Sequence, residues 1–427
     1  MELEQLLNSY DYKAKDYFLK VVSFPTQADV EEKPQSLAKF FKCANWIAEE
    51  LKSAGVKKVE ITKQGYVYGT IPSNIKENAT LPSSHSFGRK THTIALMAHY
   101  DTALENPDSP VIAMHHKYTS GNIKLPHNNV MIKSTELKGK KGQTVITSDG
   151  QAQLGGDDKA GVATVMDVAR FLVKNPQIKH GDIKLVFNNN EEVGSGIKYL
   201  DFKKLGADYA YCLDNGEVGR LFVENFNAEA CDIEITGVTV HPGYAKKQMI
   251  NALFLVNELV TTLRKQFKAP EDSENRQPYL GLSGIEGNWT KVKAHYILRG
   301  FDKKEVVKMQ KAIQTEIKKL KKKYPKAKFE VNWDKTHRYQ NAGEILKKNP
   351  LITEMAKKAY RAVGVKVIPD LTRGGFDGVN MSFKGLPTTN LFNGGMNFHG
   401  LNEWVTVEEL ELTVRMLAHL VELWGKR

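Results

Sequence analysis

The stretch Thr93–Asp101, which reads TIALMAHYD, decides the fold class of this chain. Its apolar run is typical of a strand buried in a sheet, and a histidine and an aspartate follow it at once. Two further runs, Ile183–Phe187 and Tyr209–Leu213, have the same character, and apolar residues recur at helical spacing over Gly161–Val173. Buried strands that alternate with helices predict a parallel α/β sheet.

Length and composition set the class of protein. The chain has 427 residues, 41% hydrophobic and 26% charged, so it can bury a core, and we expect two or three domains. No window approaches the roughly 18 apolar residues of a membrane span. The polar segment Met1–Lys20 has no apolar core of a secretory signal, and Cys43, Cys212 and Cys231 show no paired spacing. We therefore expect a cytoplasmic protein that does not bind membranes.

The net charge of +12 is compatible with nucleic-acid binding or with a lysine-rich solvated surface. The densest basic run, Lys318–Lys323, ends the helical pattern of Lys303–Lys323. Apolar residues recur there at spacings of three and four, so the lysines fall largely on the outer face. No nucleic-acid-binding motif accompanies them. We expect a solvated face and no nucleic-acid partner.

The middle of the chain predicts a second, inserted domain. Polar and apolar residues alternate in three stretches separated by two helical patterns: 231–236, 252–263, 292–298, 303–323 and 329–333. Half-polar strands with two helices predict a small α+β layer with one covered face. We place this domain at 225–339, between the two parts of a discontinuous α/β domain at 1–224 and 340–427. The polar stretch Asn78–Thr91 is interpreted as a surface loop.

Acidic residues and histidines follow the predicted strands at their carboxyl ends, where ligand sites of open α/β sheets collect. Others begin the helix near residue 160 or lie in the glycine-rich loop at 393–400. The candidates are His99, Asp101, Asp157, Asp158, Glu191, Glu192, Asp214 and His399. Each alone has a structural interpretation, such as a helix cap or a solvated turn. Their joint placement favours a functional site.

Two imidazoles and several carboxylates without a thiolate suit zinc, manganese or cobalt. A pair of metal ions needs one bridging carboxylate and two terminal ligands for each ion. Five candidates supply that number: His99, Asp157, Glu192, Asp214 and His399. Glu191 then remains beside a ligand, which is the natural place of a general base acting on water.

A set of short motifs occurs in one order along nearly the whole chain. They are HYDT at 99–102, TSDG at 147–150, LGGDDKAG at 154–161, HGDI at 180–183, EEVG at 191–194, ENFNA at 224–228, HPG at 241–243, RGG at 373–375 and NLFNGGMNFHG at 390–400. With this set the chain resembles the peptidase T family, the tripeptide aminopeptidases among the di-zinc M20 metallopeptidases. The resemblance implies a mixed-sheet, zinc-exopeptidase-like α/β catalytic domain with an inserted ferredoxin-like α+β lid domain.

The resemblance also implies roles for the five ligands. His99 and Asp214 would hold one metal ion, Glu192 and His399 would hold the other, and Asp157 would bridge the two. A cis peptide bond would follow the bridging aspartate. The ions are expected to be zinc, with cobalt and manganese as alternatives.

Five further residues receive roles from the same resemblance. Glu191 would be the general base, and Asp101 would hydrogen-bond the far nitrogen of the first histidine ligand and fix its tautomer. His241, from the lid, would stabilise the oxyanion. Arg299, together with Arg373, would bind the substrate carboxylate.

Three positions differ from the family's usual motifs. Asn190 stands where an aspartate is usual, Gly300 where an acid is usual, and Phe376 where a threonine is usual. None of the three is an expected ligand. We therefore expect hydrolysis to be intact and the substrate pocket to be altered.

These observations predict a metal-dependent aminopeptidase that removes the N-terminal residue from short peptides, tripeptides above all. The enzyme alternative is another M20 activity, a dipeptidase or an N-acyl amino acid amidohydrolase. A metal-free binding protein on the same fold is an alternative of another class, and the presence of all five ligands argues against it. The lid either pairs with a second subunit through an exposed sheet edge, forming a homodimer, or stays solvated.

Overall fold

A computed structural model describes residues 2–75 and 91–427. The polar stretch interpreted above as a surface loop therefore falls outside the described residues, except for Thr91. Among the described helices, none has both the length and the apolar character needed to cross a membrane.

The chain forms two compact units. The first extends to Val223 and also includes 345–370 and 376–427, and the second comprises 224–344 together with 371–375. The chain passes from one unit to the other within β10 (Arg220–Asn225), α8 (Gly343–Lys348) and β15 (Ile368–Thr372), and again after Gly375.

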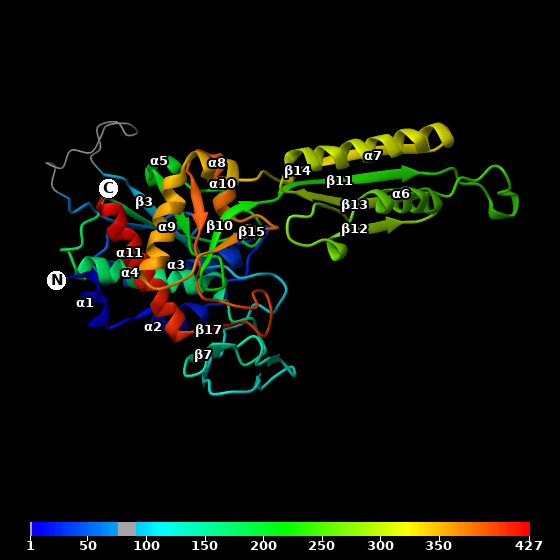
Figure 1. Ribbon diagram of the computed structural model, residues 1–427. Coiled ribbons are helices and arrows are strands. Elements are labelled where there is room, and N and C mark those ends of the chain that lie inside the picture. Colours follow the sequence, from blue (N-terminus) through cyan, green and yellow to red (C-terminus); the bar gives the residue numbers. More distant parts are fainter. Residues whose placement is uncertain (1, 76–90) are drawn as a thin grey trace. The chain divides into compact units, whose positions relative to one another are not determined.

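A six-stranded sheet forms the centre of the first unit (Figure 1). Its strands lie in the order β1 (Lys57–Ile61), β2 (Val67–Ile71), β8 (Ile183–Asn188), β3 (Ile94–His99), β9 (Tyr209–Cys212) and β16 (Thr388–Asn390). The last four run parallel, whereas β2 is antiparallel to both of its neighbours. Every residue of β3 is buried, as expected for an apolar strand covered on both faces. The prediction of a mixed α/β sheet is confirmed.

Helices pack against this sheet and against each other. They are α1 (Leu3–Asn8), α2 (Ala14–Val22), α3 (Pro34–Ser53), α4 (Gly156–Lys174), α5 (Phe202–Leu205), α9 (Pro350–Ala362), α10 (Asp377–Phe383) and α11 (Val407–Gly425). Helix α4 contacts β3, α3 contacts β1 and β2, and α11 contacts α4 and α9. The candidate site residues that follow the strands of this sheet therefore lie on a framework that is packed against helices.

A smaller region of the first unit is built mainly from the residues between β3 and α4, with one strand from near the end of the chain. It contains a three-stranded antiparallel sheet of β4 (Met114–Lys117), β7 (Thr144–Thr147) and β17 (Trp404–Thr406), and a pair of short strands, β5 (Ile123–Lys124) and β6 (Met131–Ile132). Trp404 is fully buried in the cluster that these elements share. Because β17 comes from the far end of the chain, this region is tied to the loop that carries His399.

The second unit has the element order β-α-β-β-α-β (Figure 1). Its strands are β11 (Asn227–Thr236), β12 (Tyr279–Gly287), β13 (Lys291–Gly300) and β14 (Lys328–Tyr339), and its helices are α6 (Ala252–Gln266) and α7 (Lys303–Lys323), with short 3₁₀ turns η1 (Pro242–Tyr244) and η2 (Pro270–Asp272). The sheet is antiparallel throughout, in the order β12-β13-β11-β14. The two helices and one sheet face share one hydrophobic core. The predicted ferredoxin-like α+β layer is confirmed.

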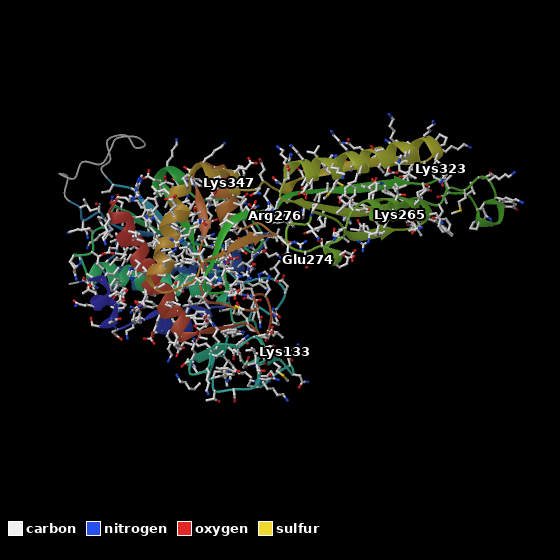
Figure 2. All side chains as sticks on the ribbon, viewed as in Figure 1. Lys133, Lys265, Glu274, Arg276, Lys323 and Lys347 are labelled. Carbon is white, nitrogen blue, oxygen red and sulfur yellow. The ribbon has the colours of Figure 1, made fainter. Side chains whose placement is uncertain are left out.

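The basic run at the end of α7 lies on its outer face. The lysines at 318–319 and 321–323 are exposed, whereas five apolar residues of that helix are buried: Val306, Met309, Ile313, Ile317 and Leu320. Lys323 is the last residue of the helix (Figure 2). This is the solvated charged face predicted from the spacing.

Candidate active site

Three neighbouring parallel strands bring their carboxyl ends to one edge of the sheet. Strand β3 lies between β8 and β9, and it ends at His99. Strand β8 is followed by the segment that carries Glu191 and Glu192, and β9 is followed two residues later by Asp214. The sheet therefore gathers these side chains, as their positions after the strands predict.

His99 is buried, with 3% of its surface exposed, and faces carboxylates on both sides. Its Nε2 lies 3.0 Å from Asp157 Oδ1, and its Nδ1 lies 3.4 Å from Asp101 Oδ1. The Asp101 carboxylate also accepts the backbone N–H groups of Glu191, at 3.3 Å, and Glu192, at 3.2 Å. Asp101 thus orients the histidine and holds the acidic segment beside it.

Asp157 lies between the two histidines. Its Oδ1 is 3.0 Å from His99 Nε2, and its Oδ2 is 3.3 Å from His399 Nε2. The residue occupies a non-helical kink at the start of α4, and the peptide bond to Asp158 is cis, as the resemblance implies. A carboxylate with one oxygen toward each histidine is placed to bridge two cations.

Two other buried carboxylates hold the backbone around Asp157. Glu403 accepts the N–H of Gly155 at 2.6 Å and that of Asp157 at 2.9 Å. Asp158 accepts the N–H of Gly161 at 3.1 Å and the Asn393 side-chain amide at 2.9 Å. Because these oxygens accept N–H donors, both residues hold the backbone of the site in place.

His399 approaches from a loop. Its Nε2 lies 3.0 Å from Glu192 Oε2, and its side chain is 39% exposed. The other oxygen of Glu192, Oε1, is buried and has no hydrogen-bond partner among the described residues. A buried carboxylate oxygen without a partner is costly, so this atom points to a missing cation or donor.

Asp214 completes the cluster on the other side of His99. Its Oδ1 lies 3.9 Å from His99 Nε2. The Asn390 side chain holds its backbone, since Oδ1 accepts the Asp214 N–H and Nδ2 donates to the Asp214 carbonyl, both at 2.8 Å. Asn390 ends β16, the strand next to β9, so the sheet itself fixes this side of the site.

Glu191 pairs with no lysine or arginine among the described residues. Its Oε1 accepts the backbone N–H of Asp377 at 3.2 Å, and its Oε2 lies 4.0 Å from His99 Nε2. The Asp377 carboxylate is held in turn by the Asn188 amide at 2.6 Å. One oxygen of Glu191 is therefore anchored while the other faces the ligand cluster.

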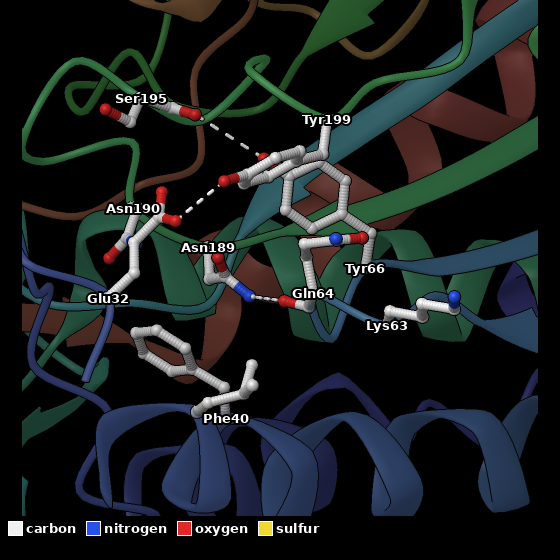
Figure 3. Close-up of a pocket in the computed structure, with 10 residues that line it drawn as sticks. Glu32, Phe40, Lys63, Gln64, Tyr66, Asn189, Asn190, Ser195 and Tyr199 are labelled. Atoms are coloured by element: carbon white, nitrogen blue, oxygen red, sulfur yellow. Dashed lines mark hydrogen bonds between the residues drawn. The ribbon is translucent and has the colours of Figure 1, made fainter. Parts of the chain in front are cut away.

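A pocket of about 170 Å³ lies behind the segment that carries Glu191 (Figure 3). Asn189 and Asn190 line it, and Asn189 donates its side-chain amide to the Gln64 carbonyl at 2.8 Å. Across the pocket, Tyr199 donates its hydroxyl to Glu32 at 2.7 Å. The bond of Asn189 thus holds the chain two residues before Glu191.

The cluster concentrates negative charge in a buried place. Burial raises the pKa of Glu191 and of Asp214 well above their ordinary values, and nearby carboxylates add to both shifts. Burial and the charge of Asp157 raise the pKa of Glu192 to about 7. Burial opposes the charge of Asp157, yet hydrogen bonds with His399 and His99 keep its pKa below the ordinary value. Additional positive charge would stabilise this arrangement.

The donor set fits divalent metal ions. Imidazole and carboxylate donors from two overlapping groups come within metal-binding distance of one another: His99 with Asp158 and Asp214, and His99 with Asp157 and Glu192. Glu192, which has one buried oxygen without a partner among the described residues, belongs to the second group. Nitrogen and oxygen donors without thiolate suit zinc, cobalt or manganese. The cluster is a candidate metal site.

Comparison with known proteins agrees with this geometry. The model of peptidase family M20/M25/M40 matches residues 155–423. A peptidase T from Clostridium perfringens is 36% identical and covers 97% of this chain and 100% of its own length. The chain belongs to peptidase family M20/M25/M40.

Solved structures share the fold of this M20 chain. A tripeptidase from Staphylococcus aureus superposes with a TM-score of 0.75 at 19% identity and covers 97% of this chain and 98% of its own. The aminopeptidase PepT from Bacillus cereus superposes with a TM-score of 0.72 at 21% identity and covers 99% of each chain. These structures confirm the predicted fold, and the family match together with the peptidase T relatives confirms the prediction of a metallo-aminopeptidase.

The three remaining candidates of this M20 chain lie in the second unit. The His241 ring is exposed, and its Nδ1 accepts the N–H of Gly243 at 3.1 Å. Arg299 donates to the carbonyls of Glu229 and Leu298, both at 3.0 Å. Arg373 donates to the Ser273 carbonyl at 2.8 Å, and its buried Nε has no partner among the described residues. Arg373 therefore keeps a donor nitrogen that no described residue uses.

Arg373 is also held between two aromatic rings. Its guanidinium lies 5.3 Å from the ring centroids of both Phe226 and Tyr279. Tyr279 pairs with Arg299 across the neighbouring strands β12 and β13. The two arginines are therefore neighbours within the second unit, a relation that their separation in the sequence does not indicate.

Sequence reasoning missed the residues that support the ligands of the M20 site. Glu403, Asp377 and Asn390 each hold the backbone or the side chain of a residue more than 170 positions away. Two of them lie in or next to motifs that were singled out, since Asn390 begins the glycine-rich segment and Asp377 follows Arg373-Gly374-Gly375 closely. Their proximity to these motifs is the signal in the sequence that could have identified Asn390 and Asp377 as supporting residues.

Proposed function

We propose that this chain is a di-metal aminopeptidase that removes the N-terminal residue from short peptides, with tripeptides preferred. The observation that carries the proposal is the position of Asp157, with one carboxylate oxygen toward each of two histidines and Glu191 beside them. His99 and Asp214 would hold one ion, Glu192 and His399 the other, and Asp157 would bridge. The native ions would be zinc, with cobalt or manganese as alternatives.

The metal ions would supply Lewis acidity to a carbonyl and to water. Glu191 would take the proton of the attacking water and return it to the leaving amine. The N–H of Asp377 supports this role, because it anchors Oε1 and leaves Oε2 toward the cluster. Asp101 would keep His99 in the tautomer whose Nε2 faces the ligands.

His241 and Arg299 from the lid, and Arg373, which the resemblance gives to the catalytic domain, keep their expected roles as proposals. His241 would stabilise the oxyanion, which needs a donor placed where negative charge develops. Arg299 and Arg373 would bind the substrate carboxylate, since guanidinium groups pair with carboxylates through two donors. The partnerless Nε of Arg373 supports its share of this role.

Two wider proposals concern assembly and location. Strand β12 is an edge strand, and Ile285 on it and Phe254 on α6 are 49% and 73% exposed. We propose a homodimer in which this surface of the lid meets its copy, because a twofold axis would cover the same side chains on both chains. Cys43, Cys212 and Cys231 are buried free thiols, which supports a reducing cytoplasmic location.

A substrate panel tests the proposed function. Matched di-, tri- and tetrapeptides, with free or acetylated N-termini, are incubated with the protein after chelation, with and without added zinc. Cleavage of free tripeptides that is lost on chelation and restored by zinc is expected. Preferred cleavage of dipeptides would show a dipeptidase, and cleavage of blocked substrates alone would show an amidohydrolase. Binding of peptide without cleavage, with the ions bound, would favour a binding protein.

A further inference from the structure

The two histidines of the site are held very differently. His99 belongs to strand β3 and is buried between Asp101 and Asp157. His399 lies in a loop, 39% exposed, with a backbone φ of +64° that non-glycine residues rarely adopt. A ligand on such a loop needs other contacts to keep its ring in one orientation.

Glu105 and Asn106 make those contacts. The Glu105 carboxylate lies 3.4 Å from His399 Nδ1, the ring nitrogen that faces away from Asp157 and Glu192. The Asn106 side-chain amide donates to the backbone carbonyl of His399 at 2.7 Å. One residue thus contacts the ring and its neighbour contacts the backbone of the same histidine.

The segment that carries the pair is itself anchored. Gln27 donates its side-chain amide to the carbonyls of Ala103, at 3.2 Å, and Asn106, at 2.6 Å. The Gln27 backbone N–H donates to Asp108 at 3.1 Å, and Asp108 also pairs with Lys39. These bonds fix both ends of a short segment that would otherwise be an exposed loop.

We propose that Glu105 and Asn106 are positioning residues for His399 and set the affinity of the metal ion that His399 shares with Glu192. An acceptor at Nδ1 favours the tautomer that carries its proton there, which leaves the Nε2 lone pair free for an ion. Asn106 fixes the backbone from which the ring projects. This inference rests on the proposed di-metal function and concerns the second ion alone.

Metal titration of the full-length protein tests the proposal. After chelation, zinc binding is measured by competition with a chromophoric chelator for wild type, Glu105→Ala, Glu105→Gln and Asn106→Ala. Loss of such a supporting contact weakens metal binding about 10-fold to 100-fold. We expect Glu105→Ala and Asn106→Ala to lower the affinity for one of the two ions by that factor and to leave the affinity for the other unchanged. Glu105→Gln should recover most of the loss, because its amide carbonyl still accepts from Nδ1–H.

A matched control separates this effect from a general loss of stability. Glu49 is an exposed carboxylate on α3, and Glu49→Ala should bind both ions as wild type does. Thermal unfolding of the metal-free variants should match that of the metal-free wild type. A structural role alone would lower the unfolding temperature without selecting one ion.

The outcomes distinguish the two proposals. If wild type binds two ions and cleaves peptides while Glu105→Ala and Asn106→Ala bind both ions equally well, the positioning role is overturned and the proposed function stands. An equal loss of affinity for both ions, or no recovery of affinity in Glu105→Gln, also overturns the positioning role. If wild type binds fewer than two ions, the proposed di-metal function fails and this inference fails with it.

Discussion

In the first unit, the acidic side chains of the site are buried. In the second unit, other acidic side chains form ion pairs on a sheet face that is exposed to solvent. Glu191, Glu192 and Asp214 expose at most 15% of their side chains and share two histidines. On strand β11, Asp232 and Glu234 each meet a lysine of β13, at 2.8 and 2.7 Å, with 36% and 26% of their side chains exposed. The same residue type is thus placed in two opposite environments.

The difference shows where this protein accepts a free-energy cost. Burying carboxylates beside one another opposes their charge, as the raised pKa values of Glu191 and Asp214 indicate. Exposed pairs such as those of Asp232 cost little and contribute little. Buried groups with perturbed pKa values gather at functional sites because the chemistry requires them. Substitutions in the two places should therefore differ in size and even in sign.

The largest expected effect is on turnover and comes from Glu191. Glu191→Gln keeps the shape of the side chain but cannot accept the proton of water, so kcat should fall by about 10²–10⁴. Both metal ions should remain bound, because Glu191 is not among the proposed ligands. Steady-state kinetics on a tripeptide and metal analysis of the same sample measure the two quantities. Glu49→Gln is the control and should turn over substrate as wild type does. If the kcat of Glu191→Gln stayed within threefold of wild type, Glu191 would not be the general base.

The next effect concerns the buried support of Asp157. Glu403→Ala leaves the N–H groups of Gly155 and Asp157 without their acceptor, which should lower the free energy of unfolding by about 2–3 kcal/mol. Glu403→Gln keeps one acceptor oxygen and should lose about half as much. Urea unfolding of the metal-free proteins measures both values. Equal stability of the alanine variant and wild type would show that water replaces this carboxylate without cost.

A substitution in the cluster should stabilise the protein while impairing its function. Burial and the charge of Asp157 raise the pKa of Asp214, so ionising this side chain in the metal-free protein costs free energy. Asp214→Asn removes that cost and should raise the free energy of unfolding of the metal-free protein near neutral pH, with a gain that grows as the pH rises above the ordinary aspartate pKa of about 4. The same variant should bind at least one ion more weakly and gain less from added zinc. A metal-free variant that is less stable than wild type would contradict this view of the cluster.

Much of the site could be predicted because its ligands follow local patterns. His99 and Asp214 come directly after apolar runs, and parallel strands bring their carboxyl ends to one edge. The helix at 303–323 and the alternating strands of the lid could be predicted for the same reason, because burial of one face makes apolar residues recur at a regular spacing. Local periodicity thus places both the sheet and the residues at its edge.

The supporting residues could not be found in this way. Glu105 contacts His399, and Glu403 contacts Asp157, across 294 and 246 positions. Such bonds depend on how distant segments pack and leave no period in either segment. The hairpin of β1 and β2 and the small sheet of β4, β7 and β17 were not predicted either. Their strands are short, and β2 and β17 pair with strands that are distant in the sequence, β8 and β7.

The smallest expected effect is on the lid sheet. Asp232 contacts Lys293 at 2.8 Å and His295 at 2.7 Å, and these hydrogen bonds lower its pKa. Asp232→Asn should therefore cost only about 0.5 kcal/mol of unfolding free energy near neutral pH, because the pair is solvated. A carboxylate with a lowered pKa in the folded state stabilises the protein above its ordinary pKa and loses that contribution as the pH falls through the folded value. The difference between variant and wild type should thus shrink as the pH falls below about 4, and also in about 1 M salt. Urea unfolding across that range measures it, and a cost above about 2 kcal/mol that salt does not change would mean that this face is buried against a partner.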